Sequence, residues 1–264
     1  MAKIIVSLTT YGENTKNLAP KAIKSLMKQT IKPDAIVLWL GYGTKVNWRL
    51  KLLSLRGLSI NFCEDIGPST KALPAMKEYP EDTIVTADDD ILYPKNWLER
   101  LLDASKDHPG RIIAHRAHRI TKGPSNKILP YNDWEKCVNP LEGEDWGLFP
   151  TGVGGVLYPS GSIPSRAFDI DELKKLTPNN DDIWLWATAN LNIDYFNNEP
   201  PYVVLRDGFS RDLVFVSPER EATSQQTLGS QNVLSGGNDV QMKNIIDAMP
   251  ELEAVLNRIA PRVV

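Results

Sequence analysis

Three consecutive aspartates, Asp88, Asp89 and Asp90, are the residues of this chain whose type and spacing most clearly suggest chemistry. They follow an apolar run at residues 83–87, which has the character of a buried strand. Carboxylates this close repel one another and raise one another's pKa values unless a cation lies nearby. Hard oxygen ligands suit Mg²⁺ or Mn²⁺, which hold a substrate diphosphate with one or two protein carboxylates. Because side chains alternate along a strand, we predict that Asp88 and Asp90 face the metal and substrate together.

Two readings of this triplet compete. In the first, Asp90 and Asp88 bind the metal while Asp89 caps the next turn or supports the metal from behind. In the second, the triplet is only an acidic turn with one aspartate as a helix cap, which explains one carboxylate well and three poorly.

A second acidic pair, Asp181 and Asp182, precedes the apolar residues 183–187, which are expected to form a helix. An aspartate at a helix start is often only an N-cap. The same carboxylate could instead serve as a general base. Trp184 and Trp186 follow directly, and tryptophans at this spacing favour core packing over a sugar-stacking surface.

The pattern around these motifs predicts an α/β protein. Short apolar runs alternate with helix-like segments, which indicates βαβ units and a mostly parallel, Rossmann-type sheet flanked by helices. Strands are expected at 4–8, 35–40, 58–62, 83–87 and 111–114, and helices at 18–29, 48–55, 69–77 and 96–105.

The second half of the chain is less regular. Residues 116–151 form a long connection rich in turn formers and aromatics, which is typical of a functional loop. A strand is expected within 152–158, a helix from 181 and a strand at 202–205, whereas the polar segment 219–237 has the composition of a mobile loop. From 239 the spacing predicts a helical C-terminal extension docked on the core and divided by Pro250.

Net charge, cysteine spacing and the lengths of the apolar runs exclude several classes of protein. The formal charge of −3 argues against a nucleic-acid binder that relies on an overall basic field. Cys63 and Cys137 lie far apart, which excludes a cysteine-based zinc site and is typical of a reducing compartment. No run approaches the ~18 apolar residues that span a bilayer. We therefore expect a cytoplasmic protein, and peripheral attachment to the inner face of a membrane stays open.

Three segments together resemble a known enzyme family. These are residues 4–13 (IIVSLTTYGE), residues 86–90 (TADDD) and the acidic pair that starts the later helix. They are similar to nucleotide-sugar-dependent glycosyltransferases of the GT-A fold, most of all to the family-2 type of bacterial polysaccharide enzymes, over roughly residues 3–205. The resemblance implies a catalytic domain at 1–210, with a nucleotide-binding half at about 1–115 and an acceptor half at about 116–210. Residues 211–264 would be a mobile loop and helices packed on that domain.

The resemblance also implies a set of substrate-binding residues: Thr9, Thr10, Tyr11, Asp65, Lys71, Asp88, Gly154 and Gly155. The first three would hold the nucleotide, Asp65 its base, Lys71 the ribose or phosphate, and the two glycines the donor sugar. Simpler interpretations remain for each: a strand ending in a turn, an Asx-turn at Asp65, a solvated charge at Lys71, and a tightly packed bulge at the glycines.

For catalysis, the resemblance implies Asp182 as the base and Asp181 as a cap or acceptor ligand. The family more often has Glu at the first place, so the assignment between the two stays open. The implied reaction is Mn²⁺- or Mg²⁺-dependent transfer, with inversion, from a UDP- or GDP-sugar to a glycan, lipid-linked or protein-linked acceptor. A sugar-nucleotide nucleotidyltransferase and a non-catalytic carbohydrate-binding protein are the alternatives. Candidates for a diphosphate contact are Arg116, Arg119, Arg206 and Arg211, whereas His115 and His118 are more typical of strand-end residues.

Overall fold

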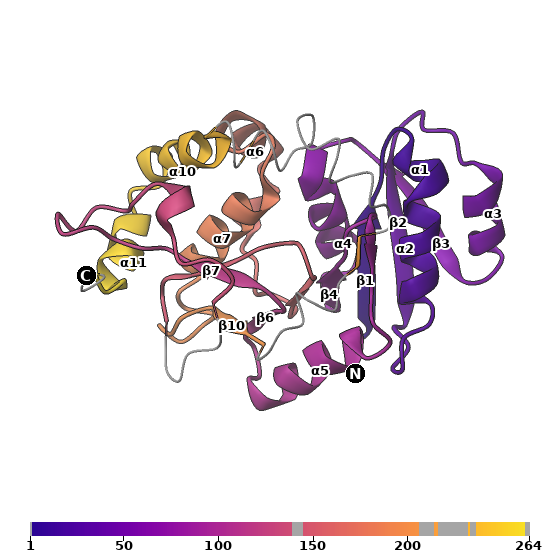
Figure 1. The fold of residues 1–264 in the computed structure, drawn as a ribbon, viewed down its shortest axis with the longest axis horizontal. Helices are drawn as coiled ribbons and strands as arrows, with labels where there is room; N and C mark the ends of the chain where they lie inside the picture. The colour runs from indigo at the N-terminus through magenta and orange to yellow at the C-terminus, as the bar shows by residue number, and fades with distance from the viewer. Residues whose placement is uncertain (1, 139–144, 206–213, 216–231, 233–235, 262–264) are drawn as a thin grey trace.

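The computed structural model describes residues 2–138, 145–205, 214–215, 232 and 236–261 (Figure 1). Its centre is a seven-stranded sheet in the order β10-β6-β9-β4-β1-β2-β3. The strands are β1 (Ile4–Thr9), β2 (Ala35–Gly41), β3 (Leu58–Cys63), β4 (Thr83–Thr86), β6 (Ile112–Ala114), β9 (Val156–Tyr158) and β10 (Tyr202–Val204). Neighbours are parallel except β9, which runs antiparallel to both β4 and β6. The predicted α/β class with a mostly parallel sheet is confirmed.

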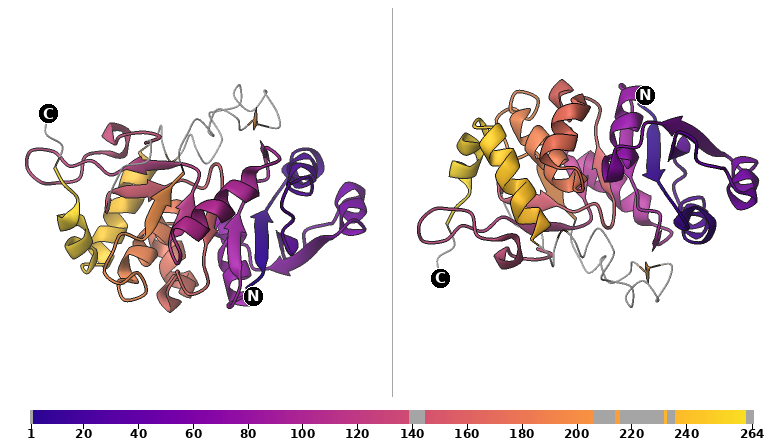
Figure 2. Two further views of the ribbon diagram at one scale, coloured as in Figure 1. Left: turned by 90° about the horizontal axis from the view of Figure 1, so that it is seen from below. Right: turned by 90° about the horizontal axis from the view of Figure 1, so that it is seen from above.

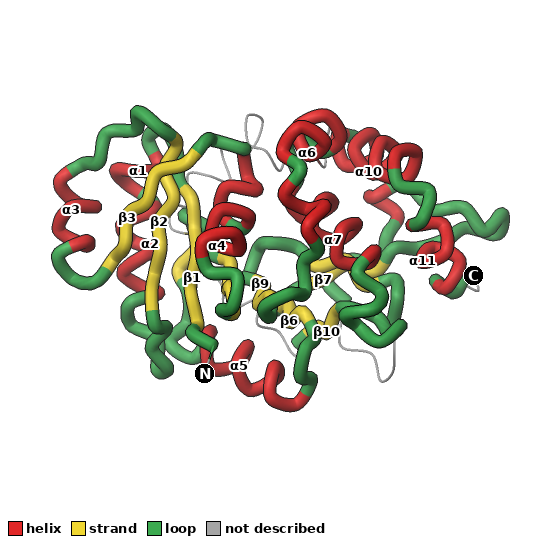
Figure 3. The backbone as a smooth tube through the Cα atoms, turned by 180° about the vertical axis from the view of Figure 1, so that it is seen from behind, coloured by secondary structure: helices red, strands yellow, loops and turns green. Residues whose placement is uncertain are grey.

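Helices cover both faces of this sheet (Figures 1 and 3). Those of the first half are α1 (Asn14–Asn17), α2 (Ala19–Leu26), α3 (Trp48–Ser54), the 3-10 helix η1 (Gly67–Lys71), α4 (Leu73–Glu78) and α5 (Trp97–Asp107). Side-chain alternation along β1 divides them. Val6 and Leu8 pack in one cluster with residues of α2, α3 and α5, whereas Ile5 packs on the opposite face with Ala75 of α4.

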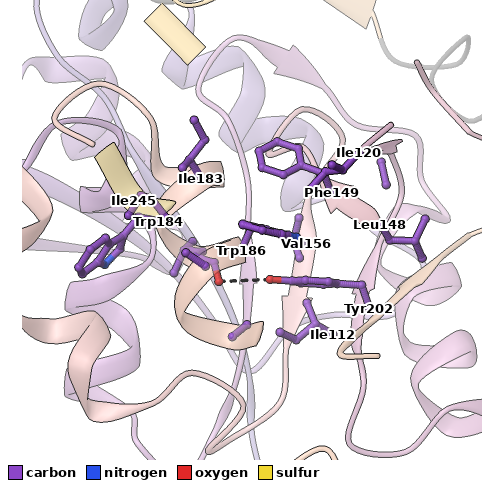
Figure 4. Packing of buried hydrophobic residues seen from close by; sticks show 14 of the residues in the cluster. Ile112, Ile120, Leu148, Phe149, Val156, Ile183, Trp184, Trp186, Tyr202 and Ile245 are labelled. Atoms are coloured by element: carbon purple, nitrogen blue, oxygen red, sulfur yellow. Dashed lines mark hydrogen bonds between the residues drawn. The ribbon is translucent and has the colours of Figure 1, made fainter. Parts of the chain in front are cut away.

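The second half builds its own core around the end of the sheet. Its elements are β7 (Ala117–Arg119), η2 (Tyr131–Asp133), β8 (Leu148–Pro150), η3 (Ser165–Phe168), α6 (Ile170–Leu176), α7 (Asp181–Leu191), α10 (Gly237–Ala248) and α11 (Leu252–Arg258). Trp184 and Trp186 are fully buried, so their predicted core role is confirmed (Figure 4). In the same cluster the Tyr202 hydroxyl donates to the Leu185 carbonyl at 3.2 Å.

The C-terminal extension packs on α7. Met242 and Ile245 of α10 and Leu252 of α11 are buried in the cluster that contains the α7 tryptophans. Pro250 stands between the two helices, as predicted. None of the helices within the described ranges is both long and apolar enough to cross a membrane.

Several predicted elements differ from the observed ones. The segment 69–77 divides into η1 and α4 because Pro74 occupies the first turn of the second helix and cannot continue the first. The connection 116–151 contains β7 and β8, which pair antiparallel, and the two-residue β5 (Ile91–Leu92) pairs with β11 (Val214–Phe215). Strands of two or three residues are too short to show a period. The predicted mobile segment 219–237 lies almost entirely outside the described residues.

Candidate active site

Lys71, the last residue of η1, joins the two acidic motifs of the sequence. Its Nζ lies 2.9 Å from Asp88 Oδ1 and 3.1 Å from Asp181 Oδ2. The residue is only 8% exposed, so the alternative interpretation of Lys71 as a solvated charge is wrong. Burial by itself would lower the pKa of Lys71, but Asp181 and Asp88 outweigh it and raise the pKa well above its ordinary value. Lys71 is therefore a fixed cation between the two carboxylates.

The backbone of Lys71 is held by the sheet. Ser7 of β1 donates from its hydroxyl to the Lys71 carbonyl at 2.6 Å, and Trp39 of β2 donates from Nε1 to the same hydroxyl at 3.1 Å. Ser7 and Trp39 are both buried. These hydrogen bonds explain why Ser7, a polar residue, is buried in the middle of the apolar strand β1. Its hydroxyl holds the end of η1 against the sheet.

The acidic pair begins α7, and neither member caps it. The N-cap is Asn180, whose side chain accepts a hydrogen bond from the Ile183 amide at 2.9 Å. The side-chain nitrogen of Asn180, Nδ2, donates to Oδ1 of Asn238 at the start of α10, at 2.7 Å. Asp181 and Asp182 are then the first two helical residues, a position at which an ionised carboxylate interacts favourably with the helix dipole. The interpretation of Asp182 as only a cap is wrong.

Asp182 is held in place by a backbone group instead. The Gly152 amide donates to Asp182 Oδ1 at 2.8 Å. The pKa of Asp182 is raised to about 8 by burial and by the neighbouring Asp181, with a smaller contribution from Asp88; Lys71 and the Gly152 hydrogen bond oppose the rise. A carboxylate that titrates near neutral pH is matched to taking a proton from a substrate.

The aspartate triplet lies beyond its strand. Because β4 ends at Thr86, strand alternation does not set the directions of the three carboxylates, and this premise of the sequence prediction fails. Asp89 accepts a hydrogen bond from the Thr10 hydroxyl, and the Asp88 amide donates to the Tyr93 hydroxyl oxygen at 2.7 Å. Asp90 is only 4% exposed. The triplet is thus tied to the end of β1 and to η1.

The donor set of this triplet fits a hard divalent cation. Within the ranges that the structure describes, no three or more His, Cys, Asp or Glu residues group as a preformed metal cage. Mg²⁺ and Mn²⁺ do not need one, because they are commonly held by one or two carboxylates and complete their shell with substrate phosphates and water. Asp88 and Asp90 supply carboxylate oxygens of the required kind.

The other predicted nucleotide residues surround the same edge of the sheet. Thr9 donates from its hydroxyl to the Trp39 carbonyl at 3.0 Å, and Tyr11 is 66% exposed. Asp65 follows β3, and its Oδ1 accepts from the Gly67 amide at 2.9 Å, so the Asx-turn considered for it is present. Its Oδ2 has no hydrogen-bond partner among the described residues. Tyr11 and this oxygen are available to a ligand.

Two glycines of the segment 152–155 are required for different steric reasons. A Cβ at Gly152 would lie 2.7 Å from Lys71 Nζ and 3.1 Å from Asp182 Oδ1. At Gly155, where φ is +92°, a Cβ would lie 2.6 Å from Trp97 Cζ2 and 2.9 Å from the Thr86 carbonyl. The Gly154 carbonyl accepts from Trp97 Nε1. The tight-packing interpretation therefore holds for Gly155, and close approach of backbone to the reactive groups holds for Gly152.

We expect Gly155→Ala to lower the free energy of unfolding by about 2–4 kcal/mol, because a positive φ and a clash with Trp97 act together. The measurement is urea unfolding followed by circular dichroism. Gly110→Ala is the matched control: its φ is +79° but nothing lies within 4 Å of its Cβ, so only about 1 kcal/mol should be lost. Equal losses in both variants would contradict the packing role.

Arg116 is the candidate arginine that stays available. Arg119 is paired with Asp145 at 2.8 Å and with Glu135 at 3.2 Å, and Arg206 and Arg211 lie outside the described residues. Arg116 donates from Nε to Cys137 Sγ at 3.2 Å, and no carboxylate pairs with it in the part of the chain that the structure describes.

The pKa of Tyr131 is influenced by both Arg116 and Asp182 of the acidic pair. Burial and Asp182 raise the pKa of Tyr131 to about 12, and Arg116 opposes the rise. Asp182 and Arg116 thus act with opposite sign on this one phenol.

Both histidines of this region serve the loops around the site. His115 Nε2 lies 3.1 Å from the Trp97 carbonyl oxygen. His118 Nδ1 accepts from the Cys137 amide at 3.0 Å. Burial, with Arg116 and Lys136 adding to it, lowers the pKa of His118 to about 3, so its ring is neutral at physiological pH. These contacts agree with the strand-end and loop interpretation.

Sequence reasoning missed three residues of the site. Asn180 carried a signal, since Asn before an acidic first turn is a preferred N-cap. Gly152 lay within the glycine run but was not distinguished from its neighbours. Tyr93 carried no signal, because its contact with the Asp88 amide closes a tight turn that spacing does not reveal.

Comparison with known proteins gives structural neighbours alone. No family model and no curated protein matches the chain. It is similar to S. aureus TarS, with a TM-score of 0.48 at 16% identity over 78% of this chain and 35% of that one. It is also similar to a 4-diphosphocytidyl-2C-methyl-D-erythritol synthase, with a TM-score of 0.48 at 10% identity over 86% and 99% of the two chains.

A further neighbour is the glucosyl-3-phosphoglycerate synthase from Mycobacterium tuberculosis in complex with Mn²⁺, UDP and phosphoglyceric acid. Its TM-score is 0.35 at 14% identity, over 43% of this chain and 42% of that one. The chain thus spans about a third of the TarS chain. At TM-scores below 0.5 these likenesses decide nothing about the activity of this chain.

Proposed function

We propose that this chain is a metal-dependent glycosyltransferase that moves a sugar from a nucleoside-diphosphate sugar to a hydroxyl of a glycan or glycoconjugate. The observation that carries the proposal is the junction at Lys71. One buried cation contacts Asp88 of the triplet and Asp181 of the helix pair, and Asp182 stands beside it on a glycine amide. Metal-ligating and base-type carboxylates thus meet at the carboxyl ends of the parallel strands, where ligands bind in such sheets.

The donor side of the site consists of Tyr11, Asp65 and the triplet. Tyr11 offers an exposed ring for a nucleotide base, and the Asp65 Oδ2 offers an acceptor for a base N–H. Asp90 and Asp88 would hold Mn²⁺ or Mg²⁺, which when bound neutralises the charge that develops on the leaving diphosphate. A UDP- or GDP-sugar meets these requirements.

Asp182 supplies the base for transfer. Its carboxylate takes the proton of the acceptor hydroxyl while that oxygen bonds to the anomeric carbon. The bond from that carbon to the diphosphate oxygen breaks, and its electron pair leaves with the diphosphate. Direct displacement of this kind inverts the configuration at the anomeric carbon. Asp181 is already paired with Lys71, so its role is to fix that cation.

A panel of nucleotide sugars with Mn²⁺ and oligosaccharide acceptors tests the proposal. Acceptor-dependent release of nucleoside diphosphate, with an inverted linkage by NMR, is the expected result. Release of pyrophosphate from a nucleoside triphosphate and a sugar phosphate would show a nucleotidyltransferase instead. Binding of glycans without turnover of any donor would show a carbohydrate-binding protein.

Asp90→Asn tests the metal ligands by binding alone. We expect the affinity for UDP or GDP in Mn²⁺ to fall by at least about tenfold, since a loss of about 1.4 kcal/mol in binding is enough for that change. The melting temperature should stay the same or rise, because removal of one carboxylate relieves repulsion within the triplet. Isothermal titration calorimetry with and without Mn²⁺ measures the effect.

The matched control is Asp103→Asn, on the exposed side of α5, where a neighbouring Lys106 already compensates the charge. Its nucleotide affinity should equal that of the parent protein. Metal-dependent nucleotide binding that survives Asp90→Asn unchanged would remove Asp90 from the metal site.

A further inference from the structure

The first helical layer carries a charge opposite to that of the whole chain. Residues 14–58 hold nine basic residues and one acidic residue, Asp34, although the chain as a whole has a net charge of −3. The basic residues are Lys16, Lys21, Lys24, Lys28, Lys32, Lys45, Arg49, Lys51 and Arg56, and all nine are exposed. Within the described residues only Lys16 has a carboxylate partner, Glu13 at 2.7 Å. The positive charge of this layer is therefore not neutralised by the protein itself.

On α2 the charges lie on the exposed side. Lys21 and Lys24 are three residues apart, which puts them on one face of the helix, and the exposed Lys28 lies in the turn that follows it. Ile23 and Leu26 on the other face are fully buried against the sheet. The lysine face of α2 is thus turned away from the protein core.

On α3 an apolar stripe lies beside the charges. Trp48, Leu52 and Leu55 are 69%, 41% and 85% exposed and follow helical spacing, whereas Leu50 and Leu53 of the same helix are buried. Leu50 and Leu53 suffice to pack α3 against the core, so packing does not explain the three exposed residues. Exposed large apolar side chains in a row, rimmed by charges, mark an interaction surface.

The two helices are neighbours in the fold. α2 packs against α3, and α1 contacts both. Figures 1 and 2 show these helices together at one end of the molecule, away from α10 and α11. We call the exposed residues of α2 and α3 and of the turns that follow them the α2–α3 face, defined by Lys21, Lys24, Lys28, Trp48, Lys51, Leu52 and Leu55.

We propose that the α2–α3 face docks on an anionic lipid surface. Lysines are attracted by acidic headgroups, and a tryptophan with two leucines can enter the boundary between headgroups and acyl chains. A nucleic acid or other soluble polyanion would use the charges but would leave the leucines in water. A second copy of the chain would cover the leucines but would bring like charges together. Lipid is the occupant that matches both parts of the surface.

Docking here brings the lipid to the start of α3, beside the carboxyl ends of the strands where the candidate active site lies. Trp48 begins α3 shortly after the carboxyl end of β2, and the exposed Tyr42 stands between them. Tyr11 follows β1 at the same edge. Lipid binding itself does not depend on the proposed glycosyl transfer; if that transfer is established, a lipid-linked acceptor would be presented to this edge.

Vesicle binding tests the proposal directly. The full chain is sedimented with vesicles of phosphatidylcholine alone or of phosphatidylcholine with phosphatidylglycerol. We expect binding to the anionic vesicles alone and loss of binding as ionic strength rises. Trp48 is the one exposed tryptophan of the seven, so anionic vesicles should blue-shift the emission and protect it from acrylamide. Trp48→Phe should remove that change.

Two double variants separate the parts of the surface. Lys24→Glu with Lys28→Glu should weaken vesicle binding by at least about tenfold, since each charge near an anionic surface contributes roughly fivefold. Leu52→Ser with Leu55→Ser should weaken it by a similar factor through lost apolar burial. Both pairs are solvent-exposed, and unchanged melting temperatures and nucleotide affinity would show that fold and donor site are intact.

Val240→Ser with Lys243→Glu on α10 is the matched control, because Val240 is 61% exposed and the side chain of Lys243 is 74% exposed. This variant should bind vesicles like the parent chain. The proposal is overturned if anionic vesicles are not bound, or if both α2–α3 variants still bind them. If vesicles are not bound and the leucine variant abolishes self-association, the face binds a second copy of the chain and the proposal is overturned. If an oligonucleotide is bound and vesicles are not, the partner is a nucleic acid and the proposal is overturned as well.

Discussion

Asp182→Asn is expected to lower kcat by a factor on the order of 10² to 10⁴ while donor affinity persists. The amide keeps the shape of the side chain and can still accept from the Gly152 amide, but it cannot take a proton from the acceptor. Helix α7 should keep its N-cap, because that residue is Asn180 and not Asp182. Steady-state rates of diphosphate release, with donor binding measured separately, check both parts.

Asp181→Asn is the kinetic control for this prediction. It removes a partner of Lys71 rather than the proposed base, so its effect on kcat should be smaller. If Asp181→Asn lowers kcat more than Asp182→Asn does, Asp181 is the base and Asp182 is the partner of the cation. If the product retains the donor's anomeric configuration, direct displacement is refuted whichever aspartate is essential.

The raised pKa of Asp182 has two consequences for pH. Activity of the parent enzyme should increase as pH rises toward about 8, because the base must be ionised. Stability should change in the opposite direction. The folded state keeps the Asp182 proton up to a pH of about 8, whereas the unfolded chain releases it near its ordinary, lower pKa. The free energy of unfolding therefore decreases as pH rises through this window, and Asp182→Asn should flatten that slope.

Lys71→Met is the second change with a large expected effect. It would leave Asp88, Asp181 and Asp182 close together without their shared cation. Loss of one partner from a buried ion pair costs about 3–5 kcal/mol, and we expect a loss of unfolding free energy of that order at neutral pH. Because Lys71 lowers the pKa of Asp182, the pH profile of kcat/KM should also move to higher pH in this variant.

Lys77→Met on the exposed side of α4 is the matched control and should change neither quantity. Restoration of Lys71→Met stability at acidic pH, where the carboxylates are protonated, would support the charge argument. An Asp182-dependent pH profile that does not move in Lys71→Met would contradict the role of Lys71 in setting the base.

Much of the fold could be predicted because its signals are local. The apolar run of β1 and the turn formers around it define a buried strand in any context. The amphipathic C-terminus with Pro250 likewise indicated two helices without reference to the rest of the chain. The missed η3, α6, β7 and β8 are short, and they form because distant parts of the chain pack against them.

The site could be predicted in its residue types but not in its connections. Asp88 and Asp182 were proposed because each belongs to a run of adjacent carboxylates, which repel one another unless a cation or partner lies nearby. The role of Lys71 was not found, because its two partners lie 17 and 110 positions along the chain. Gly155 was grouped with ligand contacts because a sequence does not show that Trp97 occupies the space beside it.

The hydrogen bond from Asn180 to Asn238 has a consequence for how the chain is made. The side chain that caps α7 is itself oriented by the first turn of α10, which leaves the ribosome almost sixty residues later. During synthesis, a nascent chain can already contain every aspartate of the candidate site and the whole central sheet, yet it lacks the partner that orients the cap of α7. Competence should therefore arise only after residue 238 has been synthesised. A fusion junction or stop codon placed before that residue should yield a chain that has the aspartates of the candidate site but little turnover.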